Sequence, residues 1–457
     1  MKEDFLSQIE TSEPVVTEPD TAAIPDVPVK EVPFLRRLMA KAFGLAAQQV
    51  TVVLFDQGFC CIANFLTGVL VARACSKEEY GYYVLGFTLL TVAMNIQTSL
   101  AGTPFTVFSP RLRDKEHRLY LGSTLVQHLA VSAFAVLGFL AAAAVLFAAR
   151  RTGNFAGVLF ALAAASVFVL LRDFMRHVLL AQLRVWASLL MGLVANVATV
   201  GILLLAYRGG WLTAPLAYLI LGASSSLPVL FVLLSETKWI TFASNKLWEH
   251  VKENWRFGKW LIAQVIVVFV AIQMYPWVLM LFKGSAAAGT YGVCIGLAAI
   301  ANPLFMGLNS FLGPRTAHAA RKGSAQIHRE VYLAMTFLAG PLLIILLCTI
   351  LFGEWAIVTI YGREFAGLGH IFSIVMLAVV IAAMGGITDA GINALRRPDI
   401  AFRARLLALA VTVTLGIFLV YKLGPLGAAL GVCVARAFSV GYQLMKFQSL
   451  KNIGFQN

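Results

Sequence analysis

Apolar runs of about 20 residues, separated by short polar breaks, fill most of the chain. A run of that length can cross the hydrocarbon layer as an α-helix, whereas a membrane β-strand needs only about 10 residues of alternating character. Because unpaired backbone groups are too costly in lipid, this pattern predicts an all-α integral membrane protein. Twelve apolar runs lie near residues 46–72, 81–103, 120–149, 155–181, 186–207, 212–234, 260–282, 290–312, 331–352, 370–392, 404–422 and 425–446.

The runs fall into two similar halves. Tyr80 and Gly81 in the first hairpin are matched 211 residues later by Tyr291 and Gly292. The sequence LLAQLR at 179–184 is likewise echoed by INALRR at 392–397. We therefore predict about 12 transmembrane helices in two six-helix lobes. Since six is an even number, both lobes enter the membrane in the same direction and are expected to be related by an axis along the membrane normal.

The polar segments divide the chain further. Residues 1–31 carry eight acidic side chains against two lysines, which predicts a disordered acidic cytoplasmic tail, and residues 32–45 predict an amphipathic helix at the membrane surface. The longest polar break separates the two lobes. The predicted divisions are an N-terminal lobe at 46–234, a cytoplasmic linker at 235–259, a C-terminal lobe at 260–446 and a cytoplasmic tail at 447–457.

Composition and charge agree with a membrane protein. Sixty per cent of the residues are hydrophobic, 13% are charged, and the mean hydropathy is +0.82. The net charge of +14 arises from short basic clusters between the runs, a distribution that argues against nucleic-acid binding. With the N-terminus inside, 28 of the 36 Lys and Arg residues fall on the inner side, which predicts two cytoplasmic termini.

Several chemistries lack their sequence signals. The six cysteines show no spacing typical of a metal site or a disulfide framework. The glycine-rich segment GSAAAGTYG lacks the Lys and Ser or Thr of an ATP-binding P-loop, and no hydrolase motif is present. We therefore expect no enzyme activity and no cofactor, so energy has to come from an ion gradient, the membrane potential or consumption of the transported molecule.

Three segments carry a family resemblance. They are DQ…NFL…VLVARACSKEEYGYYVLG in the first hairpin, RDFMRHVLLAQLR after the fourth run and NALRRPDIAFRAR after the tenth. Together they resemble the polysaccharide exporters and O-antigen flippases of the Wzx type, in the MOP superfamily that also holds the MATE drug exporters. The resemblance implies two MATE-like bundles around a central cavity in the bacterial inner membrane.

The same resemblance implies the substrate and the partners. The substrate is an oligosaccharide, a repeat unit of O-antigen, capsule or exopolysaccharide, linked through pyrophosphate to a polyprenol in the surrounding membrane lipid. A polysaccharide polymerase and glycosyltransferases are the implied partner proteins, and no nucleic acid is involved.

Ionisable residues inside the runs are costly there and so mark candidate sites. Asp56 in the first run has two interpretations: it binds a proton or Na⁺, as an acid of the first helix does in the MATE exporters it resembles, or it only hydrogen-bonds a neighbouring helix. Arg172 and Arg176 lie four residues apart on one helix face and suit a pyrophosphate, although both can also extend to the interface beside Asp173. Arg436 lies deeper in its run and is the stronger candidate for a cavity cation.

One aromatic residue is also a candidate. Trp277 is interpreted either as an interface anchor or as a platform on which a sugar stacks. The predicted substrate-binding residues are thus Arg172, Arg176, Arg436 and Trp277, with Asp56 predicted for ion coupling and no catalytic or metal-binding residue.

The intramembrane arginines decide between functions. A pyrophosphate crossing the bilayer needs cationic partners, whereas an exporter of cationic drugs needs carboxylates and aromatic side chains. The leading hypothesis is therefore a flippase for a lipid-linked oligosaccharide, with a MATE-like, cation-coupled multidrug exporter as the alternative. A membrane glycosyl- or acyltransferase is a third hypothesis, but its candidate residues form no recognisable catalytic set: His318, His328, Glu330, Glu354 and Glu364.

Overall fold

The structure is a computed structural model that describes residues 45–149, 155–236, 241, 244–303, 312, 315, 316, 319, 323–395 and 397–450. Among these residues, eleven helices are long and apolar enough to cross a membrane. The shorter apolar segment Ser285–Ala301 overlaps the predicted run at 290–312, of which residues 304–311 lie outside the described residues. The prediction of an all-α membrane protein with about 12 spans is confirmed. The predicted tail at 1–31, and the predicted surface helix at 32–45 except for its last residue, lie outside the described residues.

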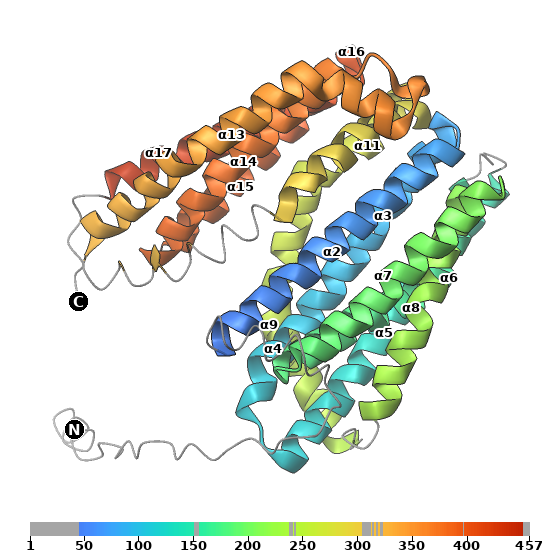
Figure 1. The fold of residues 1–457 in the computed structure, drawn as a ribbon. Helices are drawn as coiled ribbons and strands as arrows, with labels where there is room; N and C mark the ends of the chain where they lie inside the picture. The colour runs from blue at the N-terminus through green and yellow to red at the C-terminus, as the bar shows by residue number, and fades with distance from the viewer. Residues whose placement is uncertain are drawn as a thin grey trace. The chain divides into compact units, whose positions relative to one another are not determined.

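The first lobe is built around α6, which packs against α3, α5, α7 and α8 (Figure 1). This helix consists almost entirely of apolar and small residues, as its central position requires. The elements of the lobe are α2 (Leu45–Ala74), α3 (Lys77–Gln97), η1 (Thr98–Gly102), α4 (Thr103–Phe108), η2 (Ser109–Arg111), α5 (Asp114–Ala148), α6 (Phe155–Ala181), α7 (Val185–Arg208) and α8 (Ala214–Glu236).

The second lobe is built around α14, which packs against α13 and α17. Glycines with positive φ, such as Gly284 and Gly424, make the sharp turns between its helices. The elements are α9 (Ser244–Val268), η4 (Phe269–Gln273), α10 (Tyr275–Lys283), α11 (Ser285–Ala298), η5 (Ala299–Ala301), α13 (Ser324–Tyr361), η6 (Arg363–Phe365), α14 (Gly369–Ala394), α15 (Pro398–Val411), η7 (Thr412–Gly416), α16 (Ile417–Leu423) and α17 (Pro425–Ser449).

Among the described residues, one apolar cluster is shared by the two lobes, and it lies at one end of them. Near the turn between α2 and α3, a single cluster of buried side chains continues from the first lobe into the second. Toward the opposite end each lobe has its own cluster, around Phe174 in the first and Phe447 in the second. The lobes therefore adhere at the predicted outer end and have separate cores at the predicted inner end.

Close backbone contacts hold the joined end together. A Cβ atom at Gly81 of α3 would lie 1.9 Å from the carbonyl oxygen of Ser285 on α11, so only glycine permits this approach. The Arg73 guanidinium of α2 donates hydrogen bonds to the carbonyls of Thr359 and Ile360 at the end of α13. Cys75 in the adjacent turn is buried, and this burial raises the pKa of its thiol to about 12, so it is expected to stay protonated and unreactive.

Helix α9 connects the lobes along its length. Its first part packs against α5, where Tyr120 donates a 2.6 Å hydrogen bond to Asn254, and Asn254 donates a 2.8 Å bond to Gln127. Its backbone also approaches η1 closely at Gly258. Residues 244–259 of the predicted linker are therefore helical and pack on the first lobe, while the chain beyond them continues into the second lobe.

Candidate functional site

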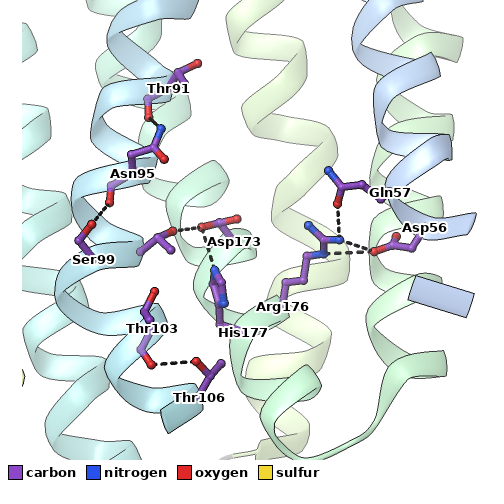
Figure 2. Close-up of polar contacts among 11 residues, drawn as sticks. Asp56, Gln57, Thr91, Asn95, Ser99, Thr103, Thr106, Asp173, Arg176 and His177 are labelled. Atoms are coloured by element: carbon purple, nitrogen blue, oxygen red, sulfur yellow. Dashed lines mark hydrogen bonds and ion pairs between the residues drawn. The ribbon is translucent and has the colours of Figure 1, made fainter. Parts of the chain in front are cut away.

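The larger of two adjoining cavities lies between α3, η1 and α4 on one side and α9 and η4 on the other, with a volume of about 490 Å³. One wall is a polar stripe, four side chains spaced by four residues, which places them along one helix face (Figure 2). The polar stripe consists of Thr91, Asn95, Ser99 and Thr103. Gln264 and Gln273 lie on the opposite wall, and none of the described residues that line this cavity is charged.

The polar stripe is rich in hydrogen-bond acceptors. The Thr91 hydroxyl donates to the Phe87 carbonyl, the Asn95 amide to the Thr91 carbonyl, and the Ser99 hydroxyl to the Asn95 carbonyl. Because the hydroxyl protons of Thr91 and Ser99 are used within the helix, their oxygens still have lone pairs for a ligand. An uncharged wall of this kind suits a ligand with many hydroxyl donors.

Both walls depart from regular α-helix at the cavity. Ser99 lies in the π-helical turn η1, and Gln273 lies in a second π-helical turn, η4. Such turns are rare and are frequent at functional sites. They place irregular backbone where the polar side chains of the two lobes face each other.

The second cavity, of about 300 Å³, shares Gln264, Val268 and Ile272 with the first, so the two cavities adjoin. Its remaining lining comes from the second lobe and includes Arg405 of α15 and Arg436 of α17. Two guanidinium groups and one carboxylate, that of Asp389 on α14, therefore face this cavity. It is a cationic chamber beside an uncharged polar one.

Asp389 is held more firmly on one oxygen than on the other. Its Oδ1 accepts a 2.9 Å hydrogen bond from the Gln443 amide. Its Oδ2 lies 3.8 Å from Nη2 of Arg405, an ion pair without hydrogen-bond contact, and the two side chains are 26% and 35% exposed. This pair is open to the cavity.

The first lobe contains a closed polar cluster instead (Figure 2). Arg176 donates to Asp56 Oδ2 from both Nε, at 3.1 Å, and Nη2, at 2.8 Å, and Nη2 also donates to Gln57. Asp56 is only 3% exposed, so its charge is compensated inside the protein. Neither side chain lines either of the two cavities.

A second carboxylate lies next to this cluster. Asp173 accepts a 3.0 Å hydrogen bond from the Thr98 hydroxyl of η1 and lies 3.8 Å from the His177 ring (Figure 2). Arg172 lies close by, and its Nη1 is buried without a hydrogen-bond partner among the described residues. The cluster connects α6 to the turn that bears Ser99, one of the cavity-lining residues.

The predicted site residues therefore fall in different places. Arg436 lines the cationic chamber, whereas Arg172 and Arg176 lie in the first lobe, where Arg176 is paired with Asp56. Trp277 donates a 2.8 Å hydrogen bond to the Thr88 hydroxyl and links α10 to α3. The structure thus does not bring the three arginines together.

Sequence analysis missed two features of the cavities. The four-residue spacing of the polar stripe was readable in the run at 81–103, since four polar residues there share one helix face. Arg405 gave no comparable signal, because it lies near the end of a run, where arginine is common.

No family model matches the chain, and no curated protein matches it either. Solved structures do match. An inward-facing multidrug resistance MATE family transporter of the MOP superfamily superposes with a TM-score of 0.69 at 13% identity, over 86% of this chain and 95% of that chain. The chain therefore shares the fold of that transporter.

Two further structures support the same fold. The lipid II flippase MurJ, in an inward closed conformation, gives a TM-score of 0.64 at 16% identity, over 86% of this chain and 87% of that one. The MATE multidrug transporter DinF-BH gives 0.62 at 18% identity, over 92% and 96%. The predicted two-lobed, MATE-like arrangement is confirmed, and the narrower resemblance to Wzx-type flippases stays a prediction.

Proposed function

We propose that this protein is a flippase that carries a polyprenyl-pyrophosphate-linked oligosaccharide across the bacterial inner membrane by alternating access. The observation that carries the proposal is the pair of adjoining cavities, one uncharged and polar, the other cationic. A lipid-linked oligosaccharide has the same two parts, a glycan rich in hydroxyl groups and an anionic pyrophosphate. A drug exporter for cations has no use for two arginines in its cavity.

Each part of the cargo is assigned to one chamber. The pyrophosphate binds Arg405 and Arg436, whose guanidinium groups match phosphate oxygens in geometry as well as charge. The glycan binds between the polar stripe and the facing glutamines, Gln264 and Gln273. Of the residues predicted from the sequence to bind cargo we retain Arg436, because Arg176 and Trp277 already have partners within the protein and Arg172 lines neither cavity.

The uneven core supports the proposal of alternating access. The common apolar cluster closes the predicted outer end, and the separate clusters leave the lobes free to part at the inner end. We place both termini in the cytoplasm, on the distribution of Lys and Arg. We keep the two predicted lobes, with the second extended to include α9 from Ser244 and α17 to Ser449. Ion coupling at Asp56 stays part of the proposal and requires that a proton or Na⁺ replace Arg176 there.

The test is a lipid analysis of a strain that lacks this gene. Mass spectrometry is expected to find completed polyprenyl-pyrophosphate oligosaccharides accumulated on the inner membrane face. Complementation with Arg436→Ala is expected to fail although the protein reaches the membrane, because its pyrophosphate site is incomplete. The matched control is Arg403→Ala, which removes an exposed arginine from the neighbouring helix α15 and should restore export.

One observation favours the alternative function. Asp389 places a carboxylate in the cavity wall, where a cationic drug can bind. If the lipid pool and the surface polysaccharide are unchanged and the strain becomes sensitive to cationic dyes, the protein is a MATE-like multidrug exporter. In that case Asp389→Asn, and not Arg436→Ala, is expected to abolish the resistance.

A further inference from the structure

Asp389 places a negative charge in the chamber to which we assign binding of the anionic pyrophosphate. Its side chain lines the cationic chamber together with Arg405 and Arg436. These three are the only charged side chains among the described residues that line it. A fixed carboxylate there repels a pyrophosphate and competes with it for Arg405.

The contacts of Asp389 show that it can be displaced from Arg405. Gln443 of α17 fixes one carboxylate oxygen of Asp389 with a 2.9 Å hydrogen bond. The other oxygen faces Arg405 at 3.8 Å, too far for a hydrogen bond. An ion pair this loose and this exposed contributes little to stability, so an anion that bonds directly to Arg405 gains more than the protein loses.

We propose that Asp389 is a displaceable counter-ion that limits the affinity for the pyrophosphate and promotes its release. This inference rests on the proposed function of the cavity. When the chamber is empty, the carboxylate partly neutralises Arg405. When cargo binds, the pyrophosphate takes over Arg405 and Arg436 while Gln443 retains the carboxylate. Repulsion from Asp389 then favours departure of the anion once the cavity opens to the other side.

A transporter needs a limit on its affinity for the molecule that it carries. Two guanidinium groups in a narrow chamber can hold a dianion so firmly that release becomes slow, and conduction through any site requires binding weak enough to permit departure. Asp389 is therefore a positioning and specificity residue rather than one that has to contact the cargo. Its removal should strengthen binding and slow transport, whereas loss of a merely structural residue should weaken both.

The test compares Asp389→Asn with the wild-type protein in nanodiscs, using farnesyl pyrophosphate as the binding probe. The variant is expected to bind the probe roughly five- to ten-fold more tightly, the effect of removing one nearby like charge from a partly exposed site. In proteoliposomes it is expected to move a lipid-linked oligosaccharide several-fold more slowly than the wild type. Asp389→Glu, which keeps the charge, should resemble the wild type in both measurements.

A matched control is Asp399→Asn, which removes the same charge from a 39% exposed carboxylate of α15 that lines neither cavity; its affinity for the probe should be unchanged. If Asp389→Asn is poorly folded by thermal unfolding, Asp389→Ser repeats the loss of charge and still accepts a bond from Gln443. Equal or weaker binding by the neutral variant overturns the inference while leaving the flippase intact. If the wild-type protein neither binds the pyrophosphate nor moves the lipid, both proposals are overturned.

Discussion

Each lobe has an ion pair between an acid and an arginine on two different helices. The pair in the first lobe is tight and lines neither of the two cavities, whereas the pair in the second lobe is loose and lines one of them. When residues 179–184 are aligned with 392–397, Arg176 of the first lobe corresponds to Asp389 of the second. Arg176 meets Asp56 at 2.8 Å in a site where Asp56 is 3% exposed, whereas Asp389 meets Arg405 at 3.8 Å in the wall of a cavity. A closed pair stabilises a helix contact, while an open one leaves its charges available to a ligand.

The same alignment explains why the ion-pair partners of Arg176 and Asp389 come from different helices. Arg405 corresponds to Gly192 on α7. A Cβ atom at Gly192 would lie 2.9 Å from Asp56, so this glycine leaves the space into which the carboxylate of α2 extends. In the first lobe the acid therefore reaches in from α2, and in the second lobe the arginine reaches in from α15.

The largest effect is expected when the closed pair is broken. Arg176→Ala leaves Asp56 buried without its cation, and breaking a buried pair in this way costs about 3 to 5 kcal/mol of folding stability. Thermal unfolding in detergent measures the loss. The double variant Asp56→Asn with Arg176→Gln should recover most of it, since it removes both charges. If Arg176→Ala unfolds like the wild type, the pair contributes nothing to stability and the contrast with the second lobe disappears.

A smaller effect is expected from filling the space at Gly192. Gly192→Ala brings a methyl group against Asp56, and overpacking of this kind costs about 1 to 3 kcal/mol. Gly201→Ala is the matched control on the same helix, because nothing lies within 4 Å of the added atom. That control should be neutral or slightly stabilising, since alanine favours a helix more than glycine does. The comparison of interest is the difference in unfolding temperature between the two variants.

Sequence reasoning reached the fold more completely than the site. Long apolar runs predict helices because the bilayer imposes both length and composition, so even the number of spans was accessible. Burying the charge of Asp56 within a membrane span costs free energy, so a compensating partner is expected. The residues near Asp56 in the sequence do not indicate that this partner is Arg176, which lies 120 residues away. The adjoining cavities depend on how α9 crosses from one lobe to the other, and the π-helical turns that line them break the very periodicity on which prediction relies.

The smallest effect on stability is expected when the open pair of Asp389 and Arg405 is broken. This experiment also distinguishes best between a structural pair and a cargo-binding pair. Arg405→Ala removes a cation whose partner remains held by Gln443 and is reached by solvent, so the stability loss should stay below about 1 kcal/mol. The same change should weaken binding of farnesyl pyrophosphate by about ten-fold or more, because a guanidinium group that bonds directly to phosphate is lost. A variant that unfolds as readily as Arg176→Ala would show that both pairs are structural. Unchanged stability with weaker binding would assign the second pair to the cargo.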